Sequence, residues 1–317
     1  MSPATSVSGS HEARREPALH GPARWAGWLL RLLGGLPLRW GQALGSLVGA
    51  LLYLRHGRTR QTVAANLALC FPELAPEARG ELLRQTLRET GRALGELPAM
   101  WTWPGSRLRG TLCEVVGREH LDAGLASARG VLIAAPHLGC WELTSHYAQL
   151  EGYRLTALYR PPRQAGLGPL VLRCRQRFGA RLVPTTAGGV RELLRALRRG
   201  ECVGILPDQD PGPDGGVLAP FFGVPAGTMV LFNRLARQSG AALLLAFAER
   251  LPAGSYRLHL RPLDEALRDP DPVLAAAALN AAIEGCVREY PAQYQWAYRR
   301  FKTRPAGTPP RYPGRRG

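Results

Sequence analysis

The chain has 317 residues, 45% of them apolar, and a formal net charge of +17. A chain of this length and composition can bury a sizeable core in one large domain or two smaller ones, which excludes a predominantly disordered protein. The positive charge predicts an anionic partner: nucleic acid, an acidic lipid surface, or an acidic substrate or carrier. We expect no nucleic-acid partner, because the sequence has no recognisable binding motif and the arginines are spread over the whole chain.

The six cysteines are widely scattered, and no two have the C-x-x-C spacing of a zinc ribbon or a redox dithiol. We expect reduced, mostly buried thiols in a protein that faces a cytosolic environment. The sequence also has no P-loop, no G-x-G-x-x-G after a strand, no G-x-S-x-G and no H-E-x-x-H. Nucleotide-binding, serine-hydrolase and zinc-protease chemistries therefore leave no trace in it.

Residues 1–22 are rich in Ser, Ala, Pro and charge without any period, which predicts a disordered N-terminus rather than a secretory signal. Residues 23–56 are apolar, with Trp and Tyr side chains that suit an interfacial belt, but arginines interrupt them. We expect a membrane-associated helical segment here, either an interfacial helical pair or one marginal span. A buried helical hairpin is the alternative.

Residues 57–304 begin with helical patterns and continue as apolar runs of strand length that alternate with helical periodicity. This alternation predicts a single α/β domain with a mainly parallel, mixed sheet flanked by helices. The predicted strands are 112–116, 131–135, 155–159, 181–183, 202–206, 242–248 and 256–260. The predicted helices are 138–151, 167–178, 189–199, 228–238 and 272–289. A basic tail, 305–317, follows the domain.

The stretch 130–151 has the strongest functional signal. Its apolar run 131–135 has the length of a buried strand, Pro136 ends it, and His137 stands at the exit before a helical pattern that contains Glu142. A carboxylate five positions after a histidine can fix the imidazole tautomer and leave the other ring nitrogen free to accept a proton. The alternative is a surface histidine and a solvated helix carboxylate.

Other unusual polar residues also follow predicted strands. Tyr159 and Arg160 end one strand, and the run Asp208-Gln209-Asp210 follows another. In open parallel sheets ligands bind at the carboxyl ends of the strands, so this shared location favours a functional role for each. An arginine there can clamp a phosphate or a carboxylate with two hydrogen bonds, although a solvent-facing arginine would look the same.

The acidic pair Asp208 and Asp210 allows three interpretations. The two carboxylates could bind a metal, hold an arginine, or belong to a Gly/Pro-rich turn. The segment fails the calcium-loop pattern because Gly212 occupies the position of the third ligand.

Two further features lie in the last third of the chain. Phe221 and Phe222 stand in a loop rather than at helical spacing, so they line an apolar pocket or pack in the core. The end of the chain is rich in cations that could lie on an acidic bilayer, touch an acidic carrier, or only solubilise the tail. These cations are Arg299, Arg300, Lys302, Arg304, Arg311, Arg315 and Arg316.

Several of these motifs, in their order along the chain, resemble the motifs of known protein families. The run APHLGCWEL resembles the H-x-x-x-x-D/E signature of the glycerolipid acyltransferase superfamily. More narrowly, YRPP, LPDQD, APFFGVPAGT and W-x-x-R-R-F-K-T-R-P resemble the late acyltransferases of lipid A biosynthesis, the Kdo-dependent lauroyl/myristoyl transferases of Gram-negative bacteria. The resemblance extends from about Trp25 to Pro305.

The resemblance implies transfer of a fatty acyl group from acyl carrier protein to a hydroxyl of a lipid A precursor, at the cytoplasmic face of the inner membrane. His137 would act as the base and Glu142 would hold its imidazole, with no metal or nucleotide cofactor. Backbone amides at the start of the helix after His137 would stabilise the oxyanion. Arg160 would meet an acceptor phosphate or Kdo carboxylate, and Asp208 would pair with an arginine such as Arg160.

Further substrate-binding positions follow from the same resemblance. They are Gly139, Tyr159, Gln209, Asp210 and Phe222. The charge of +17 would then suit an anionic lipid leaflet and an acidic carrier protein.

The chain departs from the family pattern at Cys140, where Asn is usual, and at Tyr298, where His is common. Three alternatives remain: the same chemistry on a lysophospholipid or other lipid acceptor, a metal-dependent glycosyltransferase using Asp208 and Asp210, or a non-catalytic membrane-binding protein. Motif residues do not determine the acyl chain length.

Overall fold

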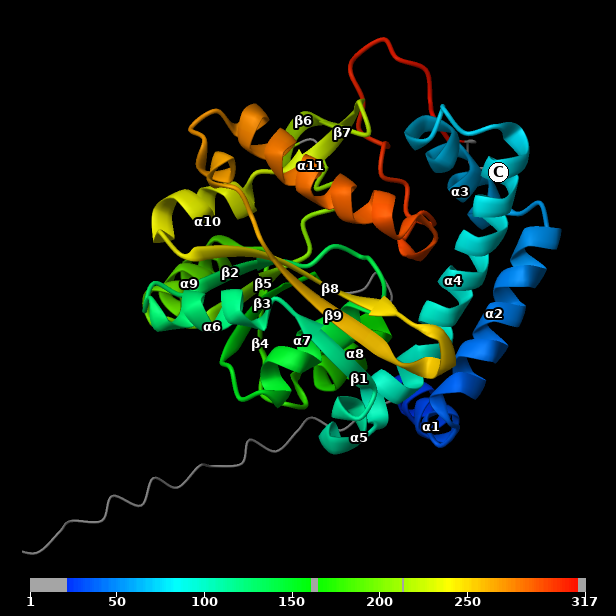
Figure 1. Ribbon diagram of the computed structural model, residues 1–317, viewed down its shortest axis with the longest axis horizontal. Helices are drawn as coiled ribbons and strands as arrows, with labels where there is room; N and C mark the ends of the chain where they lie inside the picture. The colour runs from blue at the N-terminus through cyan, green and yellow to red at the C-terminus, as the bar shows by residue number, and fades with distance from the viewer. Residues whose placement is uncertain (1–21, 161–164, 213, 313–317) are drawn as a thin grey trace, which may run out of the picture.

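The computed structural model describes residues 22–160, 165–212 and 214–312. A seven-stranded sheet with the strand order β1-β9-β8-β2-β5-β3-β4 forms its centre (Figure 1). These strands are β1 (Leu112–Val116), β2 (Val131–Ala134), β3 (Leu155–Tyr159), β4 (Arg181–Pro184), β5 (Cys202–Ile205), β8 (Ala242–Arg250) and β9 (Tyr256–Pro262). All neighbouring pairs are parallel except β8 and β9. The predicted α/β class with a mainly parallel sheet is confirmed.

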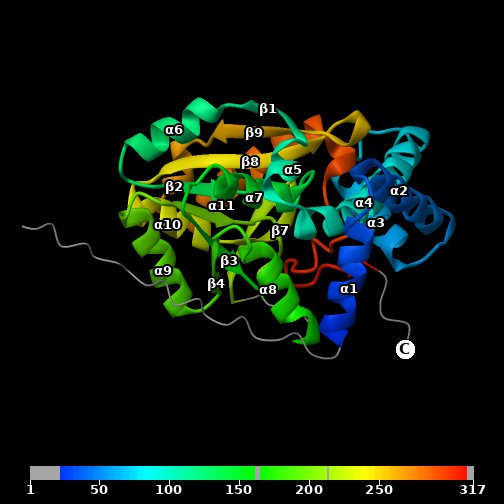
Figure 2. The same cartoon turned by 90° about the horizontal axis from the view of Figure 1, so that it is seen from below.

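Helices cover both faces of this sheet, as the view turned by 90° shows (Figure 2). They are α1 (Pro22–Gly34), α2 (Leu38–Leu54), α3 (Arg58–Cys70), α4 (Pro76–Thr102), α5 (Gly105–Arg109), α6 (Arg118–Ala126), α7 (Trp141–Leu150), α8 (Gly168–Gln176), α9 (Ala187–Arg198), α10 (Leu231–Ser239) and α11 (Pro272–Glu289).

The central strand β2 is buried on both faces, because its side chains alternate between two cores. Leu132 and Ala134 belong to the core that includes residues of α9, α10 and α11, whereas Val131 and Ile133 belong to the core that includes residues of α6 and α7. This two-residue period explains the unbroken apolar run, since a parallel strand covered on both sides has no polar face.

A small antiparallel hairpin, β6 (Gly216–Phe221) and β7 (Val224–Met229), lies outside the main sheet. The predicted helix 228–238 is therefore partly wrong, since α10 begins only at Leu231. The predicted helix 138–151 also begins later, at Trp141, because residues 138–140 bridge to Tyr294 and Ala248 instead of entering the helix.

The predicted membrane-associated segment forms α1 and α2, and α2 packs along α4. The contact is made by glycines: a Cβ added at Gly45 would lie 2.2 Å from the carbonyl oxygen of Gly91, and one at Gly49 would lie 2.1 Å from that of Leu87. Among the described residues, no helix combines the length and the apolar character needed to cross a bilayer. The prediction that this segment forms one marginal membrane span is thus unsupported.

The outward face of α2 is nevertheless apolar. Exposed fractions are 57% at Trp40, 59% at Leu47, 51% at Leu51 and 69% at Leu54. The inward face carries glycines and the buried Gln42. This distribution is the reverse of a typical surface helix, in which the apolar stripe faces the core.

The predicted cationic strip near the C-terminus is wrong for Arg300, which is buried. Its guanidinium donates to the carbonyl of Gly227, to the Thr228 hydroxyl and to the Asn280 side-chain oxygen. Arg315 and Arg316 lie outside the described residues, and so do residues 1–21 of the segment 1–22 that was predicted to be disordered.

Candidate functional site

His137 lies at the carboxyl end of β2, beside the carboxyl end of the neighbouring β5. Its ring Nδ1 is 2.8 Å from one carboxylate oxygen of Asp208, and its backbone amide donates to the other oxygen at 2.8 Å. Both side chains are largely removed from solvent, with exposed fractions of 13% for His137 and 3% for Asp208. Asp208 therefore holds both the imidazole ring and the backbone amide of His137.

The charge state of Asp208 decides which nitrogen of His137 carries the proton. Burial alone would raise the pKa of Asp208, but the attraction of His137 and the two hydrogen bonds from it hold that pKa below its usual value. An ionised carboxylate only accepts hydrogen bonds, so Nδ1 must donate. The neutral ring consequently has its proton on Nδ1 and a free lone pair on Nε2.

Two glutamines stand in front of this lone pair. The side-chain amide nitrogen of Gln209 lies 3.2 Å from His137 Nε2 and donates to the Gln295 side-chain oxygen at 3.3 Å. An amide NH2 has two donors, so both contacts fit the tautomer that Asp208 imposes. The Gln209 amide thus occupies the space in front of the free lone pair of His137 Nε2.

The prediction that Glu142 holds the imidazole is wrong. Glu142 is buried on α7 and accepts from Arg175 of α8, at 3.0 Å and 3.2 Å from the guanidinium Nε. Burial would raise the pKa of Glu142, but Arg175 lowers it below the usual value through charge and hydrogen bonds. The predicted pairing of Asp208 with an arginine is also wrong, because the Asp208 carboxylate pairs with His137.

Residues 137–140 are held rigidly by groups from distant segments. Arg250 donates to the carbonyl of Gly139 at 2.7 Å and is itself paired with the buried Glu96 at 2.7 Å. Gln293 accepts from the Gly139 amide and exchanges hydrogen bonds with the Arg250 backbone. These contacts fix the loop, and with it the base.

The predicted oxyanion donors, the amides at the start of the helix after His137, lie further along the chain than the predicted helix bounds imply. The backbone amides of Leu138, Gly139 and Cys140 already donate to the carbonyls of Pro136, Gln293 and Ala248. Amides available to an oxyanion after His137 therefore begin at Trp141, the first residue of α7, where a helix has no internal acceptors for its first N–H groups.

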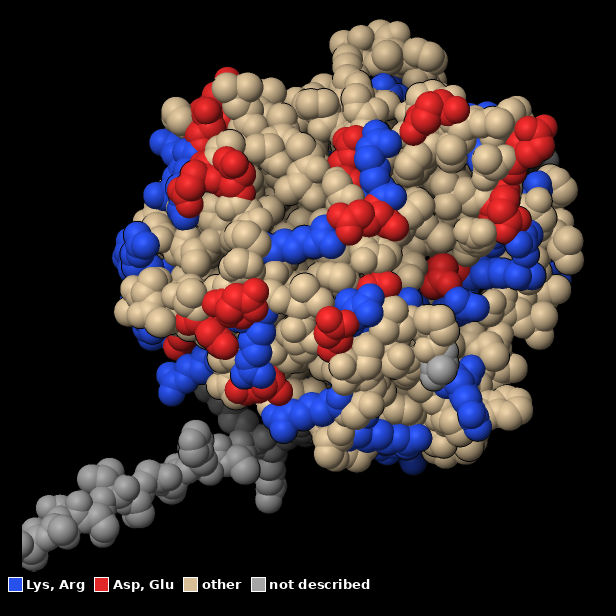
Figure 3. Space-filling view, viewed as in Figure 1, with Lys and Arg blue, Asp and Glu red and all other residues tan. Residues whose placement is uncertain are grey.

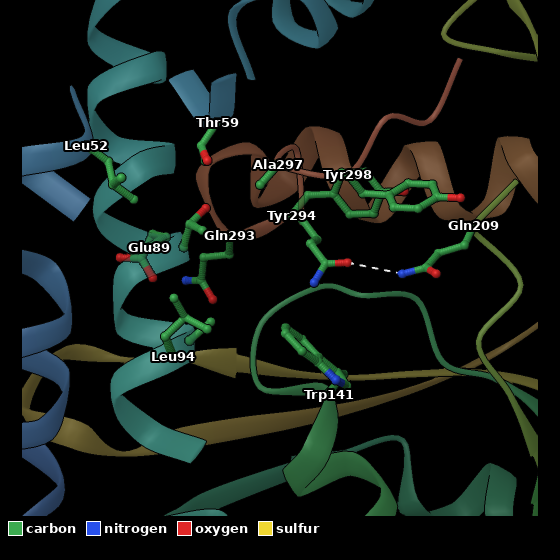
Figure 4. A pocket seen from close by; sticks show the side chains of 13 residues that line it. Leu52, Thr59, Glu89, Leu94, Trp141, Gln209, Gln293, Tyr294, Ala297 and Tyr298 are labelled. Atoms are coloured by element: carbon green, nitrogen blue, oxygen red, sulfur yellow. Dashed lines mark hydrogen bonds between the residues drawn. The ribbon is translucent and has the colours of Figure 1, made fainter. Parts of the chain in front are cut away.

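A cavity of about 450 Å³ opens beside the two glutamines (Figure 4). Its walls come from α2, α4, the start of α7 and the C-terminal segment, and they include Leu52, Leu94, Trp141, Gln209 and Tyr298. The Trp141 ring is also a direct neighbour of the base, with its centroid 5.4 Å from that of His137. The cavity thus reaches from Trp141 and Gln209, the neighbours of His137, to the helical bundle that carries the exposed apolar face.

A second cavity lies beneath α7 and is enclosed by side chains such as Ile133, Trp141 and Leu258. Its volume is about 50 Å³. That holds one or two water molecules at about 30 Å³ each, far less than a fatty acyl chain needs. Of these two cavities beside Trp141, only the one next to the glutamines is large enough for a lipid chain.

Other predicted site residues have different surroundings. Asp210 is buried, and its carboxylate accepts from the Gly212 amide and from the amide and hydroxyl of Thr303, so it attaches the C-terminal segment to the loop. The carboxylates of Asp208 and Asp210 are thus both occupied by protein donors, which leaves the predicted D-x-D metal site without ligands. No three His, Cys, Asp or Glu side chains within the described ranges are grouped as a metal site.

Arg160 is exposed at the end of β3, next to residues outside the described ranges. Tyr159 is half-buried, and its hydroxyl has no hydrogen-bond partner among the described residues. Phe222 is a core residue in the turn between β6 and β7, with its ring 5.0 Å from that of Phe71 and 5.8 Å from that of Trp296. The pocket-lining role predicted for Phe222 is therefore wrong, whereas the role of Arg160 stays a prediction.

Several residues of the site were not predicted: Arg175, Arg250, Glu96 and Gln295. Each reaches the site from a segment far away in the sequence, so no local spacing could reveal it. The sequence did contain a signal for the pairing of Asp208 with His137, because both residues follow predicted strands of one parallel sheet.

Charge on the face seen in Figure 3 is mixed, with acidic side chains interspersed among basic ones. The net charge of +17 is therefore not gathered there into one uniform basic patch. The total charge therefore does not by itself identify a binding surface for an anionic partner on this face.

Comparison with known proteins gives consistent results. A family model for bacterial lipid A biosynthesis acyltransferases matches residues 13–303. The chain is 33% identical over 303 residues to the lipid A biosynthesis lauroyltransferase of Escherichia coli K12, covering 93% of this chain and 97% of that protein. It is 34% identical over 270 residues to the palmitoleoyltransferase of the same strain, covering 83% and 85%. Identity to the myristoyltransferase of that strain is 22% over 293 residues, covering 90% of each chain.

Proposed function

Because the chain belongs to the family of bacterial lipid A biosynthesis acyltransferases, we propose that it moves a fatty acyl group from acyl carrier protein to the hydroxyl of a 3-hydroxyacyl chain on a lipid A precursor. The enzyme is an acyltransferase; the donor and the acceptor position are the proposed part. The observation that carries the proposal is the His137–Asp208 pair at the edge of a lipid-sized cavity.

The reaction begins when the acceptor hydroxyl displaces the Gln209 amide from His137 Nε2. The imidazole then takes the hydroxyl proton as the oxygen attacks the thioester carbonyl carbon, and Asp208 stabilises the imidazolium that forms. The tetrahedral intermediate collapses with loss of the thiolate, which takes the proton back from His137. The enzyme needs no nucleophile of its own, because the acceptor oxygen is the nucleophile.

The negative oxygen of the intermediate needs donors close to the base. The amides at the start of α7 are suitable, since Trp141 and Glu142 stand at a helix N-terminus directly after the His137 loop. Glu142 does not neutralise this positive end, because its carboxylate is paired with Arg175. In this proposal Glu142 acts by joining α7 to α8.

The position of the cavity supports a lipid substrate. Leu52 on α2 and Leu94 on α4 line it, and Leu94 is 56% exposed. A lipid chain could therefore pass from the exposed apolar face of the bundle to His137 without crossing the α/β core. We propose that the outward face of α2 rests in the interfacial layer of the inner membrane on its cytoplasmic side.

Membrane placement can be tested with vesicles of phosphatidylethanolamine and phosphatidylglycerol. Replacing Leu47 and Leu51 on α2 by Gln removes two exposed apolar side chains, and we expect most of the protein to leave the vesicle pellet. Val273 and Leu274 of α11, with exposed fractions of 41% and 57%, provide the control pair. Equal loss of binding in both double variants would exclude α2 as the membrane face.

The function itself is tested with purified enzyme, acyl carrier protein loaded with a fatty acid, and a Kdo-bearing lipid A precursor. We expect turnover with this pair and none with His137→Ala. Acylation of a lysophospholipid at the same rate or faster would contradict the proposal that a lipid A precursor is the acceptor. Equal use of acyl coenzyme A would contradict the proposal that acyl carrier protein brings the acyl group. Mass spectrometry of lipid A with and without the gene should show loss of one secondary acyl chain.

A further inference from the structure

The free lone pair of His137 can deprotonate either of two hydroxyl compounds, the lipid alcohol or water. Water has the same O–H group as the acceptor and is present at a far higher concentration. Its attack on the thioester carbon would break the same C–S bond and release a free fatty acid. An acyltransferase whose base is oriented before the acceptor arrives must therefore keep water away from that lone pair.

The Gln209 side chain stands in the place that such a water molecule would take. Its amide nitrogen lies 3.2 Å from His137 Nε2, so the lone pair that Asp208 leaves free accepts an amide N–H. The rest of the ring is largely enclosed, since the His137 side chain is only 13% exposed. A water molecule has to displace the Gln209 amide before it can form a hydrogen bond with the base.

Gln295 holds the Gln209 amide from its other side. Gln209 donates to the Gln295 side-chain oxygen at 3.3 Å, the contact drawn as a dashed line in Figure 4. The Gln295 backbone is itself attached to the base, because its amide donates to the His137 carbonyl at 3.0 Å. The two glutamines and His137 thus form a closed ring of contacts. Displacement of the Gln209 amide breaks two hydrogen bonds of this ring at once.

The backbone on either side of Gln209 is fixed. Asp208 is bonded to His137, and Asp210 accepts from the amide and the hydroxyl of Thr303. Both aspartates are buried, whereas Gln209 is half-buried and lines the cavity beside the base. A rotation of the Gln209 side chain is therefore enough to uncover the lone pair, while the base and its loop stay in place.

A lipid acceptor supplies binding energy for this rotation that water does not have. The cavity that Gln209 lines also has apolar walls, which include Leu52, Leu94 and Trp141. A fatty chain in this cavity gains binding energy in proportion to the apolar area that it buries, and this gain offsets the two broken hydrogen bonds. A water molecule buries no apolar area, so it gains nothing beyond the hydrogen bond that it replaces.

We propose that Gln209 is a specificity residue that shields the His137 lone pair from water, so that the acyl group passes to a lipid alcohol. This inference rests on the proposed acyl transfer. In the reaction that Gln209 suppresses, water attacks the thioester carbon while His137 takes one of its protons. The C–S bond then breaks, and the thiolate recovers the proton from His137. Gln295 is a positioning residue, since it acts through Gln209.

The shield can be tested without turnover by the reaction of His137 with diethyl pyrocarbonate, which modifies an imidazole nitrogen that has a free lone pair. Mass spectrometry of the peptide that contains His137 measures the rate. We expect Gln209→Ala to react about tenfold faster than the native enzyme, the effect of the lost hydrogen bonds. Gln85→Ala is the matched control, because Gln85 is an exposed glutamine of α4 that does not line the cavity. Equal rates in Gln209→Ala and in this control would overturn the shield.

The role against water is tested with acyl carrier protein loaded with a fatty acid, in the absence of an acceptor. We expect Gln209→Ala to release free fatty acid about tenfold faster than the native enzyme, and Gln209→Ala combined with His137→Ala to lose this gain. Damage to the fold would lower activity, so it cannot produce a gain. Unchanged hydrolysis in Gln209→Ala, or a gain that persists without His137, would overturn the role.

The two assays also separate this inference from the proposed function. A native enzyme that transfers no acyl group to a lipid A precursor would contradict the proposed function. The diethyl pyrocarbonate rates would still decide whether Gln209 shields the His137 lone pair, because that reaction uses neither an acyl donor nor an acceptor.

Discussion

The carboxylate of Asp208 accepts two hydrogen bonds from one residue, His137: one from the imidazole Nδ1 and one from the backbone amide, both at 2.8 Å. The side chain of His137 and its main chain are thus held by the same group. Such bidentate anchoring restricts ring rotation and selects the tautomer with a free Nε2 lone pair. The imidazole is therefore oriented before any substrate arrives.

The Glu142–Arg175 pair should matter for stability. Arg175→Gln would leave the buried Glu142 carboxylate without its cation, and we expect the free energy of unfolding to fall by about 3 kcal/mol. The value is at the low end for buried pairs because the Arg175 side chain is 30% exposed. Chemical denaturation measures it, with the exposed Arg191→Gln as control. Equal midpoints for the two variants would show that the pair does not join α7 to α8.

Close packing of α2 on α4 should not tolerate side chains at the glycine contact. Gly49→Ala places a methyl group 2.1 Å from the Leu87 carbonyl oxygen, so the helices must separate, at a cost of about 1–3 kcal/mol. Gly57→Ala is the control, because a Cβ at Gly57 meets nothing within 4 Å. We expect a lower melting temperature and faster proteolysis between α1 and α3 only in the first variant. Identical melting curves would contradict the packing.

The buried His146 should make stability depend on pH. Burial lowers its pKa to about 4, from an ordinary value of 6.5. Between these values the unfolded chain binds a proton that the folded chain does not, so stability is lost as pH falls from 6.5 to 4, by at most about 1.4 kcal/mol per pH unit.

His146→Phe should remove this contribution and give a flatter stability profile between pH 6.5 and 4. Denaturant titrations at several pH values measure it, and the exposed His120→Asn serves as control. A profile for His146→Phe as steep as that of the native chain would show that His146 is not the group that titrates.

The sequence predicted those parts of the fold that depend on local pattern. The strand 131–135 and its partner 202–206 were recognisable because each is an apolar run between a helix and a turn, and the structure has them side by side. The hairpin 216–229 was missed, since its Gly and Pro residues resemble those of a loop. Its pairing depends on contact with α11, which no local pattern shows.

The sequence predicted where the candidate site lies but not which carboxylate pairs with His137. His137 and Asp208 were both expected at the carboxyl ends of parallel strands, yet the closer carboxylate in sequence, Glu142, was assigned to the imidazole. The loop 138–140 delays the start of α7, and Glu142 pairs with Arg175 instead. Spacing along the chain cannot show which of two carboxylates a histidine meets, because that depends on strand order.

The most direct test is a comparison of kcat/KM for acyl transfer in Asp208→Asn and Glu142→Gln. An asparagine at 208 presents an amide that no longer selects the correct tautomer, so we expect a loss of about 10³- to 10⁴-fold. Glu142→Gln should lose much less activity, because the Glu142 carboxylate pairs with Arg175 and not with His137. A larger loss in Glu142→Gln than in Asp208→Asn would contradict the assignment of Asp208 as the partner of His137.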